Sequence, residues 1–181
     1  ESVMEGDGMI ATLRRWLNDA PSMLADEAPR RSQVPHVLIE ERKRPYPVAG
    51  VISPWNFPLI LSLIDAVPAL IAGCAVLVKP SEVTSRFVPG LERVIARVPA
   101  LQPVLRFVTG AGATGAAVVR NSDVLCFTGS VRTGRRVGEL AAQVFIPCHL
   151  ELGGKDAAIV CEDADIALAV RALTFGSMVN A

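Results

Sequence analysis

The sequence lacks an excess of charge of one sign. Its 18 lysine and arginine residues balance 18 aspartate and glutamate residues, so the formal net charge at pH 7 is zero. Proteins that bind nucleic acids or anionic membranes through their overall charge carry a basic excess. We therefore expect neither kind of partner.

The chain also has few metal-ligating residues. It contains two histidines and four cysteines without a CxxC pair: His36, His149, Cys74, Cys126, Cys148 and Cys161. Zinc sites are typically built from such pairs at short spacings, so we predict no metal site. Each cysteine has apolar neighbours, which predicts four buried free thiols. Free thiols are usual in a reducing compartment, and we expect a cytoplasmic location.

No apolar run has the unbroken character of a membrane span. The longest, residues 58–78, contains Asp65, Pro68 and Gly73. This pattern favours a buried helix followed by a buried strand. The first residues also lack the basic start and continuous apolar stretch of a secretion signal.

Hydrophobic residues make up 51% of the 181 residues, which is typical of a globular protein. The first 47 residues are mixed in character. We predict a short helix at 10–17, a linker at 20–35 rich in proline and charge, and a strand at 37–44.

From Val48 onward, short apolar runs alternate with segments of helical periodicity. Predicted strands lie at 48–53, 75–78, 104–108, 124–127, 145–150 and 157–160. Predicted helices lie at 59–72, with a break or kink at Pro68 and a cap at Gly73, and around 87–98, 112–119, 137–144 and 166–173. Strands that are apolar throughout and alternate with helices are typical of a parallel sheet covered on both faces. The predicted fold class is therefore α/β, with a Rossmann-like parallel sheet.

Such a sheet binds ligands at the carboxyl ends of its strands, which draws attention to four loops: 53–57, 79–84, 109–115 and 128–134. The third contains Gly110-Ala111-Gly112-Ala113-Thr114-Gly115, a GxGxxG match. It is either a phosphate-binding turn or a plain βα turn, and the acidic residue expected about 20 residues later is missing. The fourth, Phe127-Thr128-Gly129-Ser130, is either a phosphate-binding helix start or a simple helix cap.

The first two loops carry polar groups that suit a nucleotide and a reacting carbonyl. The lysine and glutamate of Lys79-Pro80-Ser81-Glu82 can hydrogen-bond ribose hydroxyls, or the segment is a solvated turn. In Ser53-Pro54-Trp55-Asn56-Phe57-Pro58, two prolines stiffen the loop. The amide of Asn56 can then stabilise an oxyanion, an effect worth roughly 10²–10³ in rate. The alternative is a turn asparagine beside a buried tryptophan.

Glu151 ends an apolar strand just before Gly153 and Gly154. A carboxylate in apolar surroundings becomes more basic, which suits a general base. The alternative is an edge-exposed glutamate beside a glycine hinge.

In their order and spacing, PWNFP, VKPSE, GxGxxG, FTGS and LELGGK resemble the aldehyde dehydrogenase superfamily over residues 48–165. Residues 34–47 resemble, more loosely, the extended strand that this family uses in oligomerisation. The resemblance implies an N-terminal helix, a linker and a possible oligomerisation strand in 1–47, an NAD(P)-binding Rossmann-like domain in 48–153, and the start of a catalytic domain in 154–181. It also implies oxidation of a small-molecule aldehyde to a carboxylic acid with NAD or NADP, by an enzyme that is a homo-oligomer.

The resemblance also implies roles for single residues. Asn56 is the oxyanion donor and Glu151 the general base, while Lys79 and Glu82 hold the adenosine ribose. The other implied cofactor-binding residues are Ile52, Ser53, Pro54, Trp55, Ser81, Gly112, Gly115, Phe127, Gly129, Ser130, Leu152 and Gly153.

The family's nucleophilic cysteine lies in a Gly-Gln-x-Cys segment beyond the helix that follows LELGGK. Residues 175–181 resemble the lead-in to that segment, and none of the four cysteines occupies the nucleophile's place. We expect the natural polypeptide to continue into Gly-Gln-x-Cys and this chain alone to be inactive. The alternative function is a non-catalytic nucleotide-binding protein on the same fold, although such a protein needs neither Asn56 nor Glu151. The identity of the aldehyde and the choice between NAD and NADP stay open.

Overall fold

The computed structural model describes residues 2–178, with side-chain burial described from residue 5. Five strands form one sheet in the order β5-β4-β3-β6-β7, and every neighbouring pair is parallel. The strands are β3 (Val48–Ile52), β4 (Ala75–Lys79), β5 (Leu105–Phe107), β6 (Val124–Gly129) and β7 (Cys148–Leu152). The predicted α/β class and parallel sheet are confirmed.

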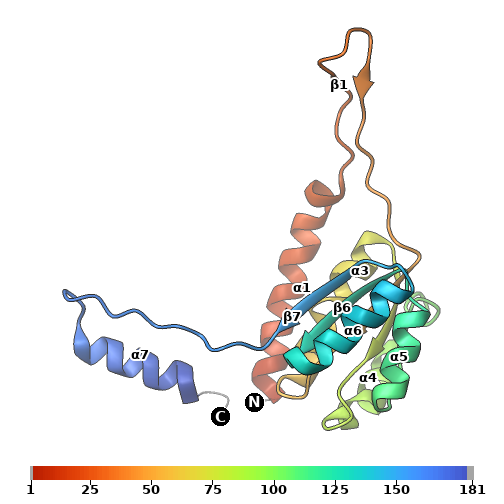
Figure 1. The fold of residues 1–181 in the computed structure, drawn as a ribbon. Coiled ribbons are helices and arrows are strands. Elements are labelled where there is room, and N and C mark those ends of the chain that lie inside the picture. Colours follow the sequence, from red (N-terminus) through yellow and green to blue (C-terminus); the bar gives the residue numbers. More distant parts are fainter. Residues whose placement is uncertain (1, 179–181) are drawn as a thin grey trace.

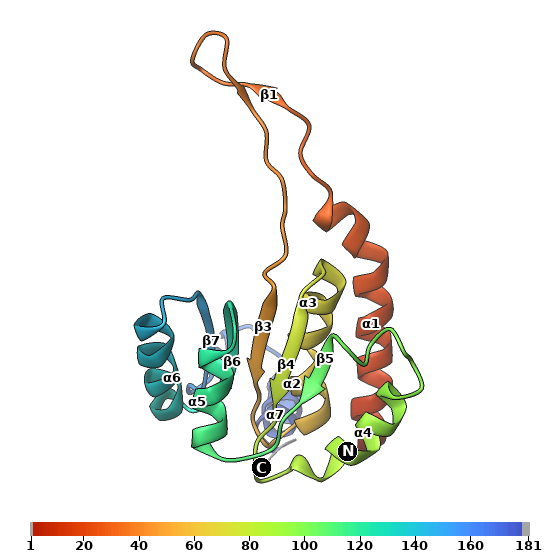
Figure 2. The ribbon, with the colours of Figure 1, turned by 90° about the vertical axis from the view of Figure 1, so that its right-hand side faces the viewer.

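Helices cover the sheet on both faces (Figure 2). One layer contains α2 (Pro58–Leu63), α3 (Ala66–Ala72) and α4 (Val88–Ile95), and α1 (Ser2–Leu24) packs outside it against α2 and α3. The other layer contains α5 (Gly112–Arg120) and α6 (Val131–Gln143). Successive side chains of a strand point to opposite faces, so Val51 joins the first layer's core and Ile52 joins the second. The central strand β3 is therefore buried from both sides.

Close packing at β3 depends on Gly50. A Cβ built on Gly50 would collide with Ser122 Oγ and lie 2.8 Å from Leu125 Cδ1. Glycine thus lets the chain that follows α5, and a side chain of β6, pack directly on the backbone of β3.

Two predicted helices differ from the observed ones in extent. The helix predicted at 10–17 runs from Ser2 to Leu24. Gly6, Gly8 and Pro21 have poor helix propensity and obscure this helix in the sequence, but packing on α2 and α3 stabilises it and leaves Met9 3% exposed. The segment predicted at 87–98 is a 3₁₀ turn, Ser85–Phe87, followed by α4.

The predicted kink at Pro68 is wrong. The helix is interrupted earlier, at Ile64 and Asp65, between α2 and α3. Pro68 lies in the first turn of α3, where a backbone N–H would have no acceptor within the helix and its loss is tolerated. The predicted cap at Gly73 is confirmed by its left-handed φ of 100°.

Residues 25–47 form an arm that projects from the body of the molecule (Figure 1). Within the arm, only β1 (Arg30–Arg31) and β2 (Leu38–Ile39) pair, in antiparallel fashion. The strand predicted at 37–44 is therefore reduced to two residues, because beyond Ile39 the two limbs of the arm share one backbone hydrogen bond, from the Glu27 N–H to the Glu41 carbonyl at 3.1 Å, and form no continuous ladder. The linker predicted at 20–35 overlaps the end of α1 and all of β1.

The strand predicted at 157–160 is wrong. Residues 153–165 contain no strand and lead away from the sheet to α7 (Ile166–Met178), as Figure 1 shows. An apolar run forms a strand only where another strand pairs with its backbone, and residues 157–160 have no such neighbour in the described chain. The strand predicted at 145–150 begins only at Cys148, after a turn in which Phe145 has a left-handed φ of 61°. No helix within residues 2–178 is both long enough and apolar enough to cross a membrane.

We expect Gly50→Ala to lower the free energy of unfolding by about 1–3 kcal/mol, because the added methyl group overpacks the interface of β3 with Ser122 and Leu125. Urea denaturation followed by circular dichroism measures the change. The control is Gly6→Ala, whose methyl group meets open space in α1 and gains up to about 1 kcal/mol of helix propensity. Equal stabilities for the two variants would contradict this account of β3.

Candidate functional site

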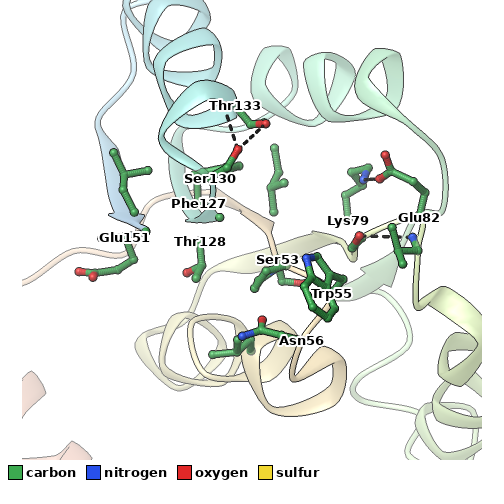
Figure 3. A pocket seen from close by; sticks show the side chains of 18 residues that line it. Ser53, Trp55, Asn56, Lys79, Glu82, Phe127, Thr128, Ser130, Thr133 and Glu151 are labelled. Atoms are coloured by element: carbon green, nitrogen blue, oxygen red, sulfur yellow. Dashed lines mark hydrogen bonds and ion pairs between the residues drawn. The ribbon is translucent and has the colours of Figure 1, made fainter. Parts of the chain in front are cut away.

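A cavity of about 650 Å³ lies at the carboxyl ends of β3, β4, β6 and β7 (Figure 3). The chain leaves β3 toward β4 and β5 on one side and later returns to β6 on the other. The connections that follow the strands thus run to opposite sides of the sheet on either side of the boundary between β3 and β6. Ligands of open parallel sheets bind at this kind of switch point, and the cavity is within the size range of cofactor sites.

One wall of the cavity carries a buried ammonium group next to an exposed carboxylate. Lys79 ends β4, its side chain is 6% exposed, and its Nζ donates to Glu82 Oε2 and to the Pro80 carbonyl, at 3.0 Å each. The Glu82 side chain is 57% exposed. Its own backbone N–H and the Lys79 ammonium lower the pKa of the Glu82 carboxyl below its ordinary value. The pair therefore presents an ionised carboxylate to a ligand.

The opposite wall is the start of α6. Ser130 is the N-cap of this helix, its Oγ accepts from the Thr133 N–H at 3.3 Å, and it also donates to Thr133 Oγ1 at 3.1 Å (Figure 3). The first turn of an α-helix has backbone N–H groups without helical acceptors, and these favour an anion. Gly134 lets the turn approach the sheet, since a Cβ there would collide with Leu152.

The floor of the cavity is the loop between β3 and α2. Trp55 is 59% exposed and Asn56 is also exposed, so both side chains are available to a ligand. Pro58 begins α2 at a position where proline is favoured, and this fixes the place where the loop ends. The alternative interpretation of this segment, a turn asparagine beside a buried tryptophan, is therefore wrong about the tryptophan, because Trp55 is exposed.

Glu151 lies on β7, directly opposite Thr128 of β6. Alternation along the strands places Glu151 and His149 on the side of the sheet that faces α3. The apolar surroundings predicted for Glu151 are absent, because β7 is an edge strand and residues 153–165 lead away from it; the side chain is exposed.

Asp65 lies between α2 and α3 and faces these two β7 residues. Burial and the negative charge of Glu151 raise the pKa of the Asp65 carboxyl, while His149 opposes the rise. The negative charge of Glu151 therefore acts on the Asp65 carboxyl behind the cavity.

Most of the predicted site residues come together in this one cavity. Those that line it are Ile52, Ser53, Pro54, Trp55, Asn56, Lys79, Ser81, Glu82, Phe127, Gly129, Ser130, Glu151, Leu152 and Gly153. Gly112 and Gly115 do not line it. Gly112 has open space around its Cα, and Gly115 packs beside Ile52 and the Lys79 stem in α5.

Sequence reasoning missed four lining residues: Leu61, Val83, Thr128 and Thr133. Thr128 lies within the FTGS motif, and Thr133 follows at the position whose N–H the Ser130 cap bonds, so the capping pattern contained a signal for both. Leu61 and Val83 carry no chemistry that a motif could mark.

The four thiols are less uniformly buried than expected. Cys74 is buried, Cys126 and Cys148 are half-buried, and Cys161 is exposed. Cys161 is exposed because its segment has no sheet or helix packed on it. Burial, aided by the nearby charge of Asp65, raises the pKa of Cys126 to about 11, so this thiol stays protonated at neutral pH. Within residues 2–178, no cluster of three or more acidic, histidine or cysteine side chains is placed to hold a metal ion.

Comparison with known proteins identifies what the chain resembles. The family model described as "Aldehyde dehydrogenase family" matches residues 1–181. A geranial dehydrogenase of Castellaniella defragrans is 37% identical over 179 residues, which are 98% of this chain and 37% of that enzyme. A betaine aldehyde dehydrogenase of Oryza sativa subsp. japonica is 40% identical over 142 residues, or 77% of this chain and 28% of that enzyme.

Solved structures agree with the sequence comparison. The putative aldehyde dehydrogenase PutA of Anabaena variabilis superposes with a TM-score of 0.93 at 51% identity, covering 98% of this chain and 38% of that one. An NAD⁺ complex of a Bacillus cereus aldehyde dehydrogenase superposes with a TM-score of 0.84 at 32% identity, covering 93% and 34%. The chain thus spans between 28% and 38% of the length of these relatives.

We expect Asp65→Asn to raise the Tm at pH 7. A carboxyl whose pKa is raised by folding destabilises the folded state when it is ionised, and the amide removes that charge. The gain should shrink as the pH falls through the raised pKa of the folded state toward the ordinary aspartate pKa of about 3.9, and it should vanish below that pH, where folded and unfolded chains both hold the proton. Thermal melts between pH 4 and pH 7 test this, with the exposed Asp163→Asn as control. A gain that is independent of pH would contradict the assigned cause.

Proposed function

The chain belongs to the aldehyde dehydrogenase family, and from this premise we propose that the protein oxidises an aldehyde to a carboxylic acid with NAD or NADP. The observation that supports this most directly is the single cavity into which four separated motif segments, from β3, β4, β6 and β7, bring their polar groups. Enzymes of this family act on aldehydes. The proposal covers aldehydes as a class and either NAD or NADP as the cofactor.

The residues of the cavity fit the adenosine and phosphate part of a nicotinamide dinucleotide. The ionised Glu82 can accept hydrogen bonds from a ribose diol, and Lys79 can donate to the same hydroxyls. The first turn of α6, capped by Ser130, offers backbone N–H groups to a phosphate. When bound, the cofactor supplies the hydride acceptor for the oxidation.

The reacting carbonyl would lie between the loop after β3 and the end of β7. We assign Asn56 as donor to the developing oxyanion, since its exposed carboxamide is held on a proline-bounded loop. We assign Glu151 as the base that activates the hydrolytic water, because the carboxylate lines the same cavity and is accessible to water. In this scheme the two groups act at different stages. Asn56 acts when the family's cysteine thiolate adds to the aldehyde carbonyl, and Glu151 acts when water hydrolyses the acyl thioester, once the nicotinamide cofactor would have accepted the hydride.

We further propose the division of the chain implied by the sequence. Residues 48–153 form the nucleotide-binding unit and 154–181 begin the catalytic part. Within residues 1–47, the projecting arm supplies a strand for homo-oligomerisation. A second candidate function, non-catalytic nucleotide binding, is favoured by one observation: none of the chain's cysteines lines the cavity that contains Asn56 and Glu151.

We expect the chain to bind ADP-ribose and NAD⁺ with affinities within about threefold of each other, because the cavity contacts described above are to the adenosine half. Calorimetry on the 181-residue chain measures both. Lys79→Met should weaken both ligands at least tenfold, since a hydrogen bond from a charged group contributes about 1.5–3 kcal/mol. The control is Lys155→Met, which removes an exposed lysine outside the cavity. A large preference for NAD⁺, or no effect of Lys79→Met, would count against this assignment.

We expect the chain by itself to produce no NADH from aldehyde and NAD⁺. None of its thiols lines the cavity, and Cys126, the one on β6 behind Asp65, stays protonated with a pKa of about 11. Absorbance at the nicotinamide band over a panel of aldehydes provides the measurement. Turnover that disappears in Glu151→Gln would show that a thiol of this chain does reach the carbonyl.

A further inference from the structure

The loop that carries Asn56 is closed at its two ends by a pair of buried hydroxyls. Ser53, directly after β3, and Ser62, on α2, place their Oγ atoms 2.7 Å apart. Ser53 is 4% exposed and Ser62 is fully buried. A buried hydroxyl without a partner is strongly destabilising, so each serine needs the other. The bond therefore fixes the distance between the two ends of residues 53–62.

The middle of the same loop is tied to the neighbouring cofactor-side loop. Thr84 Oγ1 donates to the Trp55 carbonyl at 3.0 Å. Thr84 lies two residues after Glu82, in the segment that begins at Lys79. The Ser53 N–H also donates to the Lys79 carbonyl at 3.2 Å. The loop of Asn56 and the loop of Lys79 and Glu82 are thus joined at two points.

Apart from the packing of α1 on α2 and a hydrogen bond from the Ile60 N–H to Glu5 Oε1 at 3.4 Å, the other forces on this loop are weak. Helix α2 has only six residues and its N-cap, Phe57, provides no side-chain cap bond, and a helix this short has little stability of its own. Trp55 and Asn56 are exposed and contribute little packing. Pro54 and Pro58 restrict local φ angles but do not fix the loop to its surroundings. The hydroxyl contacts are therefore the specific restraints on its position.

We propose that Ser53, Ser62 and Thr84 form a hydroxyl brace that positions the Asn56 carboxamide and links its placement to the nucleotide-binding loop at Lys79 and Glu82. None of the three bonds uses the Asn56 side chain, so its N–H donors stay free for the oxyanion. The catalytic meaning of the brace rests on the proposed function. Its mechanical action on the loop does not, and the two are tested separately. The three residues act through Asn56 and are positioning residues.

The mechanical action is measured by ¹⁵N relaxation of Trp55 and Asn56 backbone amides and of the Asn56 side-chain amide. In wild type we expect backbone order parameters near the rigid value of about 0.85, and in Ser62→Ala backbone values below about 0.6, with a parallel fall for the Asn56 side-chain amide. The matched control is Ser122→Ala. Ser122 is also buried and donates one hydrogen bond, to the Val118 carbonyl at 2.8 Å, but lies outside the cavity.

Both serine variants should lower the Tm, by roughly 2–4 °C for the one hydrogen bond lost in Ser122→Ala. Ser62→Ala should cost more, because it leaves the buried Ser53 hydroxyl without a partner, whereas the Val118 carbonyl still accepts from the Asn121 N–H at 3.1 Å. Only Ser62→Ala should mobilise Trp55 and Asn56. Equal mobility of this loop in Ser62→Ala and Ser122→Ala would overturn the brace. If Ser62→Ala fails to fold, Thr84→Val provides the same relaxation test, because it removes the outer bond and leaves the buried serine pair in place.

The link to the nucleotide loop has its own readout. Saturating ADP-ribose should raise the order parameter of the Asn56 side-chain amide in wild type. This rise should be lost in Thr84→Val, whose Kd for ADP-ribose should stay within about threefold of that of wild type. A full response in Thr84→Val would overturn the link. Failure of wild type to bind ADP-ribose at all would instead refute the proposed function, and the relaxation comparison would still decide the brace.

The catalytic consequence is read in a preparation of the protein that oxidises aldehydes. Ser62→Ala should lower kcat about tenfold, a part of the 10²–10³ that one oxyanion donor contributes, and leave the KM for the nucleotide within about twofold. Ser122→Ala should leave both unchanged. A rise in KM with unchanged kcat would show that Ser62 serves cofactor binding and not the placement of Asn56.

Discussion

The parallel pairing of β3 with β4 on one side and β6 on the other is the constraint on which the rest of the structure depends. Val51 of β3 pairs with Val78 and with Cys126 in these two ladders. Parallel strands end at the same edge of a sheet, so this pairing brings the loops after Ile52, Lys79 and Gly129 to one place. Residues separated by tens of positions in the sequence thereby share one cavity.

Burial of β3 on both faces makes this register hard to change. A shift by one residue would exchange the side chains that face α3 with those that face α5 and would place Val51 where Gly50 now admits Ser122 and Leu125. The polar groups of the site lie at the edge of this sheet, where the strands end. The Lys79 ammonium is buried and the Ser53 and Ser62 hydroxyls are paired, whereas the side chains available to ligands, Trp55 and Glu82, stay exposed.

The two sides of the site differ in how far their polar groups are buried. The Lys79 side chain at the end of β4 is buried, although Ser130 at the start of α6 is exposed. Around Glu151, β7 is an edge strand, and residues 153–165 and α7 lie away from the sheet (Figure 1). Asp65, His149 and Cys126 consequently face a partly open side of the sheet.

Several features follow from the sequence alone, because they depend on local physics. Apolar runs such as 48–52 and 75–79 predict buried parallel strands, and Gly73 predicts a helix cap that the structure confirms. The order of the PWNFP, VKPSE, FTGS and LELGGK motifs identifies the family, because each motif encodes a turn chemistry at the end of a strand. The cavity-lining positions of Asn56, Lys79, Glu82, Ser130 and Glu151 were predictable from these motifs together.

Only the tertiary structure decided the features that depend on a distant partner. The apolar run at 157–160 has the composition of a strand, but no strand of the described chain lies beside it. Helix α3 tolerates Pro68 because the chain is interrupted earlier, at Asp65, so that the proline falls in the first turn of the helix. Ser62 resembles any polar residue of a short helix until the fold places it 2.7 Å from Ser53. Glu151 was predicted in apolar surroundings and is exposed, because burial of an edge strand depends on what packs over it. A local pattern fixes what a segment prefers, whereas the contacts it makes are set by segments far away in the chain.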